Sequence, residues 1–262
     1  MDFAQFKDRV RKDFRLDLQS YKETQLRRRM DAFLARHRLN DYGVLFQLLR
    51  DDRAVYEAFL DHMTINVSEF FRDPARFKEL EGAILPDLLR AKSRLNIWSA
   101  ACANGAEPYS VAIILEDLAP ARRHRLEATD IDKNILAKAQ QGKYAADAVR
   151  NVDARRLARY FTRENGSYVL KEDIRRKVSF HRHDLLTEPF IRDCDLILCR
   201  NVTIYFTREA QDRLNRQFAA ALSPGGVLFI GGSEMIFNYQ ELGLDKVSTC
   251  FYRKLEHRGA GR

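Results

Sequence analysis

The chain has 262 residues, which is enough for one large and one small domain, each with its own core. Its formal net charge of +8 predicts an acidic partner: nucleic acid, a membrane surface or an acidic protein. No apolar run approaches the roughly 20 residues of a membrane span, and the charged N-terminus has no signal-peptide core. We therefore expect a soluble, cytoplasmic protein with no direct membrane insertion.

The cysteines and histidines give no sign of a disulfide framework or a metal centre. His181 and His183 form the only metal-like pair, and the sequence suggests no third ligand near them, so no metal is expected. The cysteines lack CxxC spacing, and three fall in probable strands or strand ends, where free thiols fill space in a core. This usage fits a reducing compartment for Cys102, Cys194, Cys199 and Cys250.

Residues 1–72 show apolar positions at helical spacing and no strand pattern of comparable quality, which predicts an all-helical domain. One of its helices carries a basic cluster made of Arg27, Arg28, Arg29 and Arg36, next to apolar residues at helical spacing. A solvated helix face is the ordinary explanation of such a cluster, and a docking surface is the alternative. Residues 73–93 predict a connecting helix with Leu80, Ile84, Leu85, Leu88 and Leu89 facing inward.

Residues 95–112 predict a buried strand, a glycine turn and a helix start in direct succession. In a parallel α/β sheet, such a turn receives a ligand at the carboxyl end of the strand. The turn matches neither G-x-G-x-x-G nor the P-loop pattern, and it carries Glu107 where a phosphate would need bare amides or a lysine. A ligand with a cationic amine therefore fits this turn better than one with phosphates.

Residues 125–132 predict a second strand that ends in carboxylates, with Asp130 lying 25 residues beyond Gly105. An acidic residue at about that separation binds ribose hydroxyls in doubly wound folds, because a carboxylate can accept two hydrogen bonds from a diol. The alternative is that Asp130 and Asp132 only cap the helix predicted over residues 133–141.

Three further strands are predicted, each next to polar residues or a turn. Residues 177–186 alternate apolar and polar side chains and then present Asp184, which can accept a hydrogen bond from an adenine amine. The strand over 196–199 delivers Arg200, Asn201 and Tyr205. Residues 222–234 predict a Pro-Gly-Gly turn that feeds another buried strand. Strands that alternate with helices imply a parallel sheet with one shared site along its carboxyl edge.

An insertion over about 142–179 separates two of these strands. Its Asn165-Gly166 pair, flanked by apolar runs, predicts a hairpin. Arg163 to Ser167 form the expected loop, which is short.

The segments WSAACANGAEPYS, ATDID, HDLL, CRNVTIYF and LSPGGVLFIGGSE, with NVSEFFRD at Asn66 to Asp73, closely resemble in order and spacing the chemoreceptor glutamate O-methyltransferases of bacterial chemotaxis, the CheR family. The resemblance covers nearly the whole chain. It implies an α/β fold: a Rossmann-like class I S-adenosylmethionine methyltransferase sheet in residues 94–262, an N-terminal all-helical domain in residues 1–72, a linker helix over 73–93, and a small antiparallel β-subdomain inserted at about 142–179.

The same resemblance implies S-adenosylmethionine as cofactor, with S-adenosylhomocysteine as product, and methylation of receptor glutamates. It places Glu107 at the amine of the methionyl group, Asp130 at the ribose, and Asp184 and Leu185 at the adenine. It makes Arg72 and Tyr205 the candidates for catalysis by substrate positioning. Arg72 is also an implied cofactor residue, near the methionyl carboxylate and the reacting centre, together with Asn66, Ser68, Arg200 and Asn201.

The resemblance also implies partners. Arg27, Arg28, Arg29 and Arg36 would dock on the glutamate-rich cytoplasmic helical region of the receptors, and we expect a monomer. Some members tether to a receptor C-terminal pentapeptide through a longer loop of the β-subdomain, which this chain lacks, so pentapeptide binding is not expected. Ala106 and Gly232 stand where many members carry Glu and His, and Ser68 replaces a threonine found in some.

Ordinary alternatives remain for these residues. Arg72 could form only a salt bridge to Asp73 or Glu69, and Tyr205 could be a core aromatic. A nucleic-acid methyltransferase would also suit the basic charge, but the chain has neither an [ND]PP[YFW] loop nor a Pro-Cys nucleophile, so no nucleic-acid partner is expected. A regulatory protein that binds the donor without turnover is the third possibility, and the intact site residues argue against it.

Overall fold

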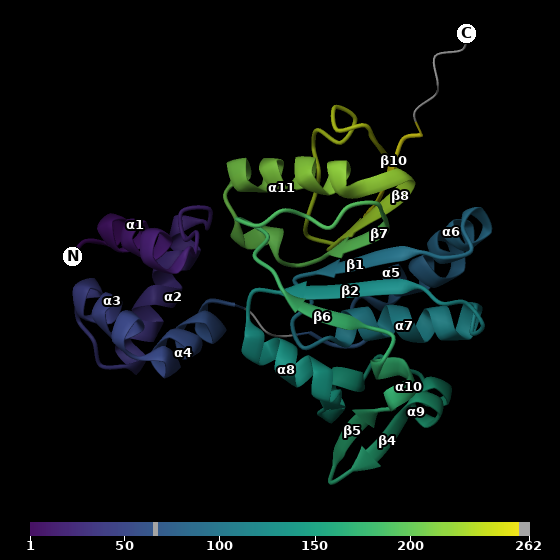
Figure 1. Ribbon diagram of the computed structural model, residues 1–262, viewed down its shortest axis with the longest axis horizontal. Helices are drawn as coiled ribbons and strands as arrows, with labels where there is room; N and C mark the ends of the chain where they lie inside the picture. Colours follow the sequence, from purple (N-terminus) through teal and green to yellow (C-terminus); the bar gives the residue numbers. More distant parts are fainter. Residues whose placement is uncertain (65–67, 257–262) are drawn as a thin grey trace.

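The computed structural model describes residues 1–64 and 68–256, and Figure 1 shows a helical N-terminal part beside a central sheet. The N-terminal part contains α1 (Phe3–Phe14), α2 (Glu23–Arg36), α3 (Tyr42–Asp51) and α4 (Arg53–Met63). Aspartate side chains cap three of these helices by accepting hydrogen bonds from first-turn amides. The core between the helices includes Phe6, Met30, Leu45 and Phe59, all with essentially no exposure. The prediction of helices in this region is confirmed.

The central sheet has seven strands within the described residues, in the order β6-β2-β1-β7-β8-β10-β9. Strands β6, β2, β1, β7 and β8 are parallel, whereas β10 is antiparallel to both β8 and β9. The carboxyl ends of the parallel strands therefore meet along one edge. The bounds are β1 (Asn96–Ala100), β2 (Arg125–Asp130), β6 (Ser179–Arg182), β7 (Cys194–Cys199), β8 (Leu222–Ile230), β9 (Leu244–Lys246) and β10 (Phe251–Lys254).

Helices cover both faces of this sheet: α11 (Arg208–Ala221) lies on one side, and α7 (Ala106–Leu118) and α8 (Lys133–Gln141) lie on the other (Figure 1). The four cysteines are free thiols buried in this domain. No helix among the described residues is long and apolar enough to cross a membrane.

The segment between the helical domain and β1 is helical, as expected, but it is divided into α5 (Pro74–Glu79), a π-helical turn η1 (Leu80–Ile84) and α6 (Leu85–Ala91). Leu80, Ile84, Leu85 and Leu88 are buried in the same core as β1 and α7, and Leu89 packs against it partly buried. These helices are therefore part of the sheet domain's packing.

The Pro-Gly-Gly sequence does not form the predicted turn before β8. Residues 223–226 lie inside β8, and the pairing of β7 with β8 shifts register between Cys194 and Leu196. Gly225 has φ +75°, so the extra residues are absorbed in an irregularity of the strand that needs a glycine.

The predicted hairpin is confirmed. β4 (Phe161–Glu164) and β5 (Ser167–Leu170) are joined by Asn165 and Gly166 alone, with φ +49° and +77°, which is the backbone that Asn-Gly favours in two-residue turns. With β3 (Lys143–Tyr144) they form a separate antiparallel sheet. The loop therefore has two residues, fewer than the sequence suggested. Short helices η2 (Ala146–Val149), α9 (Ala154–Tyr160) and α10 (Glu172–Arg175) flank this β-subdomain.

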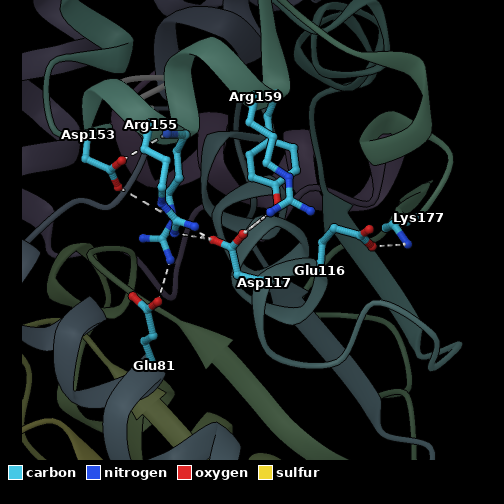
Figure 2. Close-up of polar contacts among 9 residues, drawn as sticks. Glu81, Glu116, Asp117, Asp153, Arg155, Arg159 and Lys177 are labelled. Atoms are coloured by element: carbon cyan, nitrogen blue, oxygen red, sulfur yellow. Dashed lines mark hydrogen bonds and ion pairs between the residues drawn. The ribbon is translucent and has the colours of Figure 1, made fainter.

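A buried polar cluster attaches the β-subdomain to the rest of the molecule (Figure 2). Asp117, near the end of α7, accepts hydrogen bonds from Arg156 Nε at 2.9 Å and from the Tyr160 hydroxyl at 2.6 Å, both on α9. Arg156 also pairs with Glu81 of η1. Burial opposes ionisation of Asp117, but the Tyr160 hydrogen bond and the Arg156 guanidinium hold the pKa of the carboxyl below its ordinary value.

Candidate active site

A cavity lies at the carboxyl edge of the sheet, between the sheet domain and the helical domain. Its walls come from the ends of β1, β2 and β7, from the segment that follows β6, and from Tyr21, Met63 and Thr64 of the helical domain. Most of the predicted site residues line it: Ser68, Arg72, Glu107, Asp130, Asp184, Leu185, Arg200, Asn201 and Tyr205. Asn66 lies outside the described residues.

The turn between β1 and α7 places Glu107 at the cavity. Gly105 has φ +82°, and a Cβ there would lie 2.9 Å from the Ala139 Cβ, so only glycine fits this close approach. The Glu107 carboxylate is 9% exposed, accepts a hydrogen bond from Ser99 Oγ at 2.8 Å and lies 3.4 Å from Arg200 Nη1. Burial raises its pKa, and Arg200 opposes the rise. A cationic amine beside this carboxylate would stabilise its ionised form.

Asp130 ends β2 with its carboxylate lining the same cavity. Oδ2 accepts from the Ala103 amide at 2.9 Å and Oδ1 from the Asp132 amide at 3.1 Å, which leaves each oxygen a lone pair for a further donor. Burial raises the pKa of this carboxyl to about 6. Asp132, in contrast, caps α8 by accepting from the amides of Asn134 and Ile135. The capping alternative thus holds for Asp132, whereas Asp130 lines the cavity.

Asp184 is 3% exposed and orders the turn that follows β6. Its Oδ1 accepts from the Leu186 amide and its Oδ2 from the Thr187 hydroxyl, both at 2.9 Å. Beside it, Leu185 and Ile131 supply apolar wall to the cavity. This part of the cavity therefore places apolar side chains next to a carboxylate acceptor, an environment that suits a flat ring with an amino group.

Arg200 lines the cavity, but its guanidinium is already engaged by protein groups. Nη2 donates to the Arg72 carbonyl at 3.0 Å and to Asp73 Oδ2 at 2.5 Å, and the guanidinium carbon lies 4.5 Å from the Phe229 ring centroid. Phe71 and Asp73, on either side of Arg72, have φ +51° and +60°, which is unusual for these residue types. Arg200 therefore links Glu107 to the strained segment that carries Arg72.

Glu234 is a residue of this region that the sequence patterns did not single out. Its carboxylate accepts hydrogen bonds from the amides of Asn201, Val202 and Thr203 and from the Gly231 amide, over 2.6–3.1 Å. It thereby fixes the loop after β7, including η3 (Thr203–Tyr205). A Cβ at Gly231 would lie 2.9 Å from the Asn201 amide nitrogen, so the approach requires glycine. The one sequence feature that could have pointed to this role is that Glu234 closely follows the glycine pair Gly231-Gly232.

The helical domain contributes to the wall near Tyr205. Arg29 lies with its guanidinium carbon 5.7 Å from the Tyr205 ring centroid, and its Nη1 donates to the His62 carbonyl at 2.8 Å. Tyr21 packs edge-on against Phe206 with ring centroids 4.9 Å apart. Tyr21 was not predicted, because no local pattern marks a residue that reaches the cavity from a separate domain.

The basic cluster of α2 divides into two groups. Arg29 faces inward to the end of α4, whereas Arg27, Arg28 and Arg36 are exposed. Arg27 pairs with Glu23 at 2.9 Å and lies over the Phe3 ring. Arg28 and Arg36 make no hydrogen bond or ion pair with other parts of the chain that the structure describes. They are eight residues apart, which places them about 80° apart around the helix axis.

The histidine pair has two unrelated sets of contacts. His181 Nε2 lies 2.9 Å from Glu127, whereas His183 lines the cavity with its Nε2 3.1 Å from the Pro189 carbonyl.

Comparison with known proteins decides the family. Residues 66–250 match the model for "CheR methyltransferase, SAM binding domain", and residues 1–64 match "CheR methyltransferase, all-alpha domain". The chain belongs to the CheR methyltransferase family. It is 39% identical over 254 residues to a chemotaxis protein methyltransferase of Listeria innocua, with 97% of each chain covered. It is 32% identical over 249 residues to chemotaxis protein methyltransferase 1 of Pseudomonas aeruginosa, covering 90% of this chain and 91% of that one.

Membership of the CheR family identifies the cofactor and the fold. The cofactor is S-adenosylmethionine, and the sheet domain is the class I methyltransferase fold expected from the sequence. The cavity residues fit this molecule: Glu107 and Asp130 are carboxylates of raised pKa, each able to accept hydrogen bonds from a cationic amine or a diol. The two family models meet between residues 64 and 66, close to where Met63 and Thr64 reach the cavity.

Proposed function

We propose that the chain transfers a methyl group from S-adenosylmethionine to glutamate side chains on the cytoplasmic helices of chemoreceptors, forming methyl esters. The observation that carries the proposal is that α2, on which Arg28 and Arg36 are exposed, also places Arg29 with its guanidinium carbon 5.7 Å from the Tyr205 ring centroid at the cavity wall. A glutamate-rich helix held by α2 would present a carboxylate to this cavity. The relatives named as chemotaxis methyltransferases support a receptor substrate.

The cavity offers a place to hold a carboxylate rather than to activate one. A glutamate is ionised near neutral pH and needs no general base. Cys102 and His183 contribute a thiol and an imidazole to the cavity lining. Burial raises the pKa of the Cys102 thiol well above its ordinary value, and His183 Nε2 is engaged by a carbonyl. When bound, S-adenosylmethionine would supply a methyl group on a sulfonium, open to attack at its carbon by a carboxylate oxygen, with the thioether of S-adenosylhomocysteine as the leaving group.

We assign substrate positioning to Arg72 and Tyr205. In-line displacement requires the attacking oxygen to be held on the line of the breaking bond, and positioning of this kind supplies most of the catalysis. The guanidinium of Arg72 can orient a carboxylate in a bidentate fork, and the neutral Tyr205 hydroxyl can donate without deactivating the anion. Arg200 holds the segment that carries Arg72, and Glu234 holds the loop that carries Tyr205, so both act by positioning these two residues.

We further propose that the protein acts as a cytoplasmic monomer and finds receptors through α2 rather than through a receptor C-terminal pentapeptide. The two-residue turn between β4 and β5 leaves no extended loop beside the edge of the small sheet, where an added strand would pair.

Two measurements test the proposal. After incubation of a purified receptor cytoplasmic fragment with the protein and S-adenosylmethionine, peptide mass spectrometry should map single methyl groups to glutamates, and the Arg72→Ala protein should add far fewer. Methyl groups on another residue type would refute glutamate methylation. Calorimetric titration of the pentapeptide should give no saturable heat, and saturable micromolar binding would refute the pentapeptide-independent mode.

A further inference from the structure

A second cavity of about 580 Å³ lies at the opposite, amino-terminal edge of the sheet. Arg94 precedes β1, Arg122 and Arg123 precede β2, and Arg176 and Lys177 precede β6. These three strands are neighbours in the sheet order, so the loops that enter them lie side by side. The topology thus gathers cations from three separate segments into one cavity, at the other end of β2 and α7 from Asp130 and Glu107.

The positive charge of this cavity is neutralised only in part, because Arg125 pairs with Glu127 at 2.9 Å and Arg176 with Glu172 at 2.5 Å. Glu116 is the acidic residue of the lining, and it pairs with Lys177 at 2.8 Å (Figure 2). Arg122 donates to the Leu89 carbonyl at 2.7 Å, which carries no charge. Arg94 and Arg123 are exposed and form no ion pair or hydrogen bond with the residues that the structure describes. Three guanidinium groups around the cavity therefore lack a carboxylate partner.

His124 contributes a neutral imidazole to the same lining. Its Nδ1 accepts from the Leu95 amide at 3.2 Å, so in the neutral imidazole the proton is on Nε2. That Nε2 is buried and has no hydrogen-bond partner among residues 1–64 and 68–256. Burial and the charges of Arg122, Lys177 and Arg94 lower the pKa of His124, which keeps this neutral donor form at physiological pH.

We propose that this cavity is a binding site for a small molecule with two or more phosphate groups, of nucleotide size. Guanidinium forks match phosphate oxygens in a bidentate manner, and the volume is within the range of small-ligand sites. Charge complementarity selects a polyanion, and the volume of about 580 Å³ limits its size. The site is separate from the donor cavity and is independent of the proposed methyl acceptor.

The test uses calorimetric titration of GTP and of inorganic tripolyphosphate into the full chain at low ionic strength. The protein is first saturated with S-adenosylhomocysteine, so that the adenine position of the donor cavity is occupied. Both probes should bind saturably at one site. Tighter binding of GTP assigns the site to nucleotides, and equal binding assigns it to the phosphate groups alone; either result supports the proposal.

Matched variants separate a site from general charge attraction. Arg94→Gln with Arg123→Gln should weaken both probes by about tenfold or more for each fork that contacts phosphate, with methyl transfer unchanged. Arg192→Gln with Arg216→Gln removes the same charge from exposed positions elsewhere and should leave binding nearly unchanged. Absence of saturable binding by either probe, equal losses in the two double variants, or binding of an acidic peptide but of neither probe would overturn the proposal.

Discussion

Replacement of Asp130 by asparagine tests the donor site with the smallest change in shape. The carboxylate uses one oxygen for the Ala103 amide and the other for the Asp132 amide, and each oxygen has one lone pair left for a ribose hydroxyl. An asparagine keeps a single acceptor oxygen. Its NH2 group would face either a backbone amide or a ribose hydroxyl, so at least one accepted hydrogen bond is lost.

The size of the effect follows from the charge of the acceptor. A hydrogen bond to a charged group contributes about 1.5–3 kcal/mol, which predicts that Asp130→Asn weakens S-adenosylhomocysteine binding by about 10- to 150-fold. Calorimetry measures this directly. Asp132→Asn is the matched control, because asparagine is as good a helix cap as aspartate and Asp132 caps α8 outside the cavity. Equal affinities of the wild type and Asp130→Asn would refute the ribose assignment.

The pH dependence of binding gives a second test of the same carboxyl. Its pKa of about 6 in the folded protein exceeds the unfolded value of about 3.9. The ionised form is thus disfavoured by folding, and this group destabilises the ligand-free protein most above pH 6. A ribose diol donates best to the ionised form, so donor affinity should fall as pH decreases through about 6. Asp130→Asn should remove this component and leave only that of Glu107, whose pKa is also raised.

Further predictions concern catalysis, docking and stability. Tyr205→Phe should lower turnover by about tenfold, the value of one hydrogen bond, with donor affinity unchanged; normal turnover would leave Tyr205 as packing. Arg28→Glu with Arg36→Glu should raise KM for receptor and flatten its salt dependence, whereas charge reversal at Arg192 and Arg216 should not; equal effects would assign the α2 arginines to solvated surface. Asp117→Ala should lower the free energy of unfolding in urea by about 3 kcal/mol, and Glu172→Ala, in an exposed pair, by less than about 0.5 kcal/mol. Because the pKa of Asp117 is lowered, its carboxylate stabilises the folded protein above pH 4, and this stabilisation is lost as pH falls below that. Equal decreases in the free energy of unfolding for the two variants would contradict a structural role of the cluster.

The sequence was sufficient for the features that depend on local pattern. Alternating strands and helices predicted the parallel sheet, and polar residues at strand ends predicted Glu107, Asp130 and Asp184 at one edge. The Asn165-Gly166 pair predicted its hairpin, because that dipeptide tolerates positive φ. In each case one short stretch of chain determines the outcome.

The features that were missed depend on contacts between distant segments. Pro224 and the two glycines after it predicted a turn, but pairing with β7 keeps this stretch in β8. Arg200 lines the cavity as expected, but no pattern predicted that Asp73 and the Arg72 carbonyl contact its guanidinium. Glu234 and Tyr21 lie far along the chain from the groups they contact, and no spacing rule connects them.

The most direct test of the central claim is transfer of radiolabelled methyl from S-adenosylmethionine to membranes that contain a chemoreceptor, followed by treatment of the labelled protein with mild alkali. Carboxyl methyl esters hydrolyse under these conditions and release the label as methanol, whereas methylated nitrogen keeps it. We predict receptor-dependent labelling that mild alkali removes. Label that resists alkali, or that appears equally in membranes without receptor, would contradict the assignment.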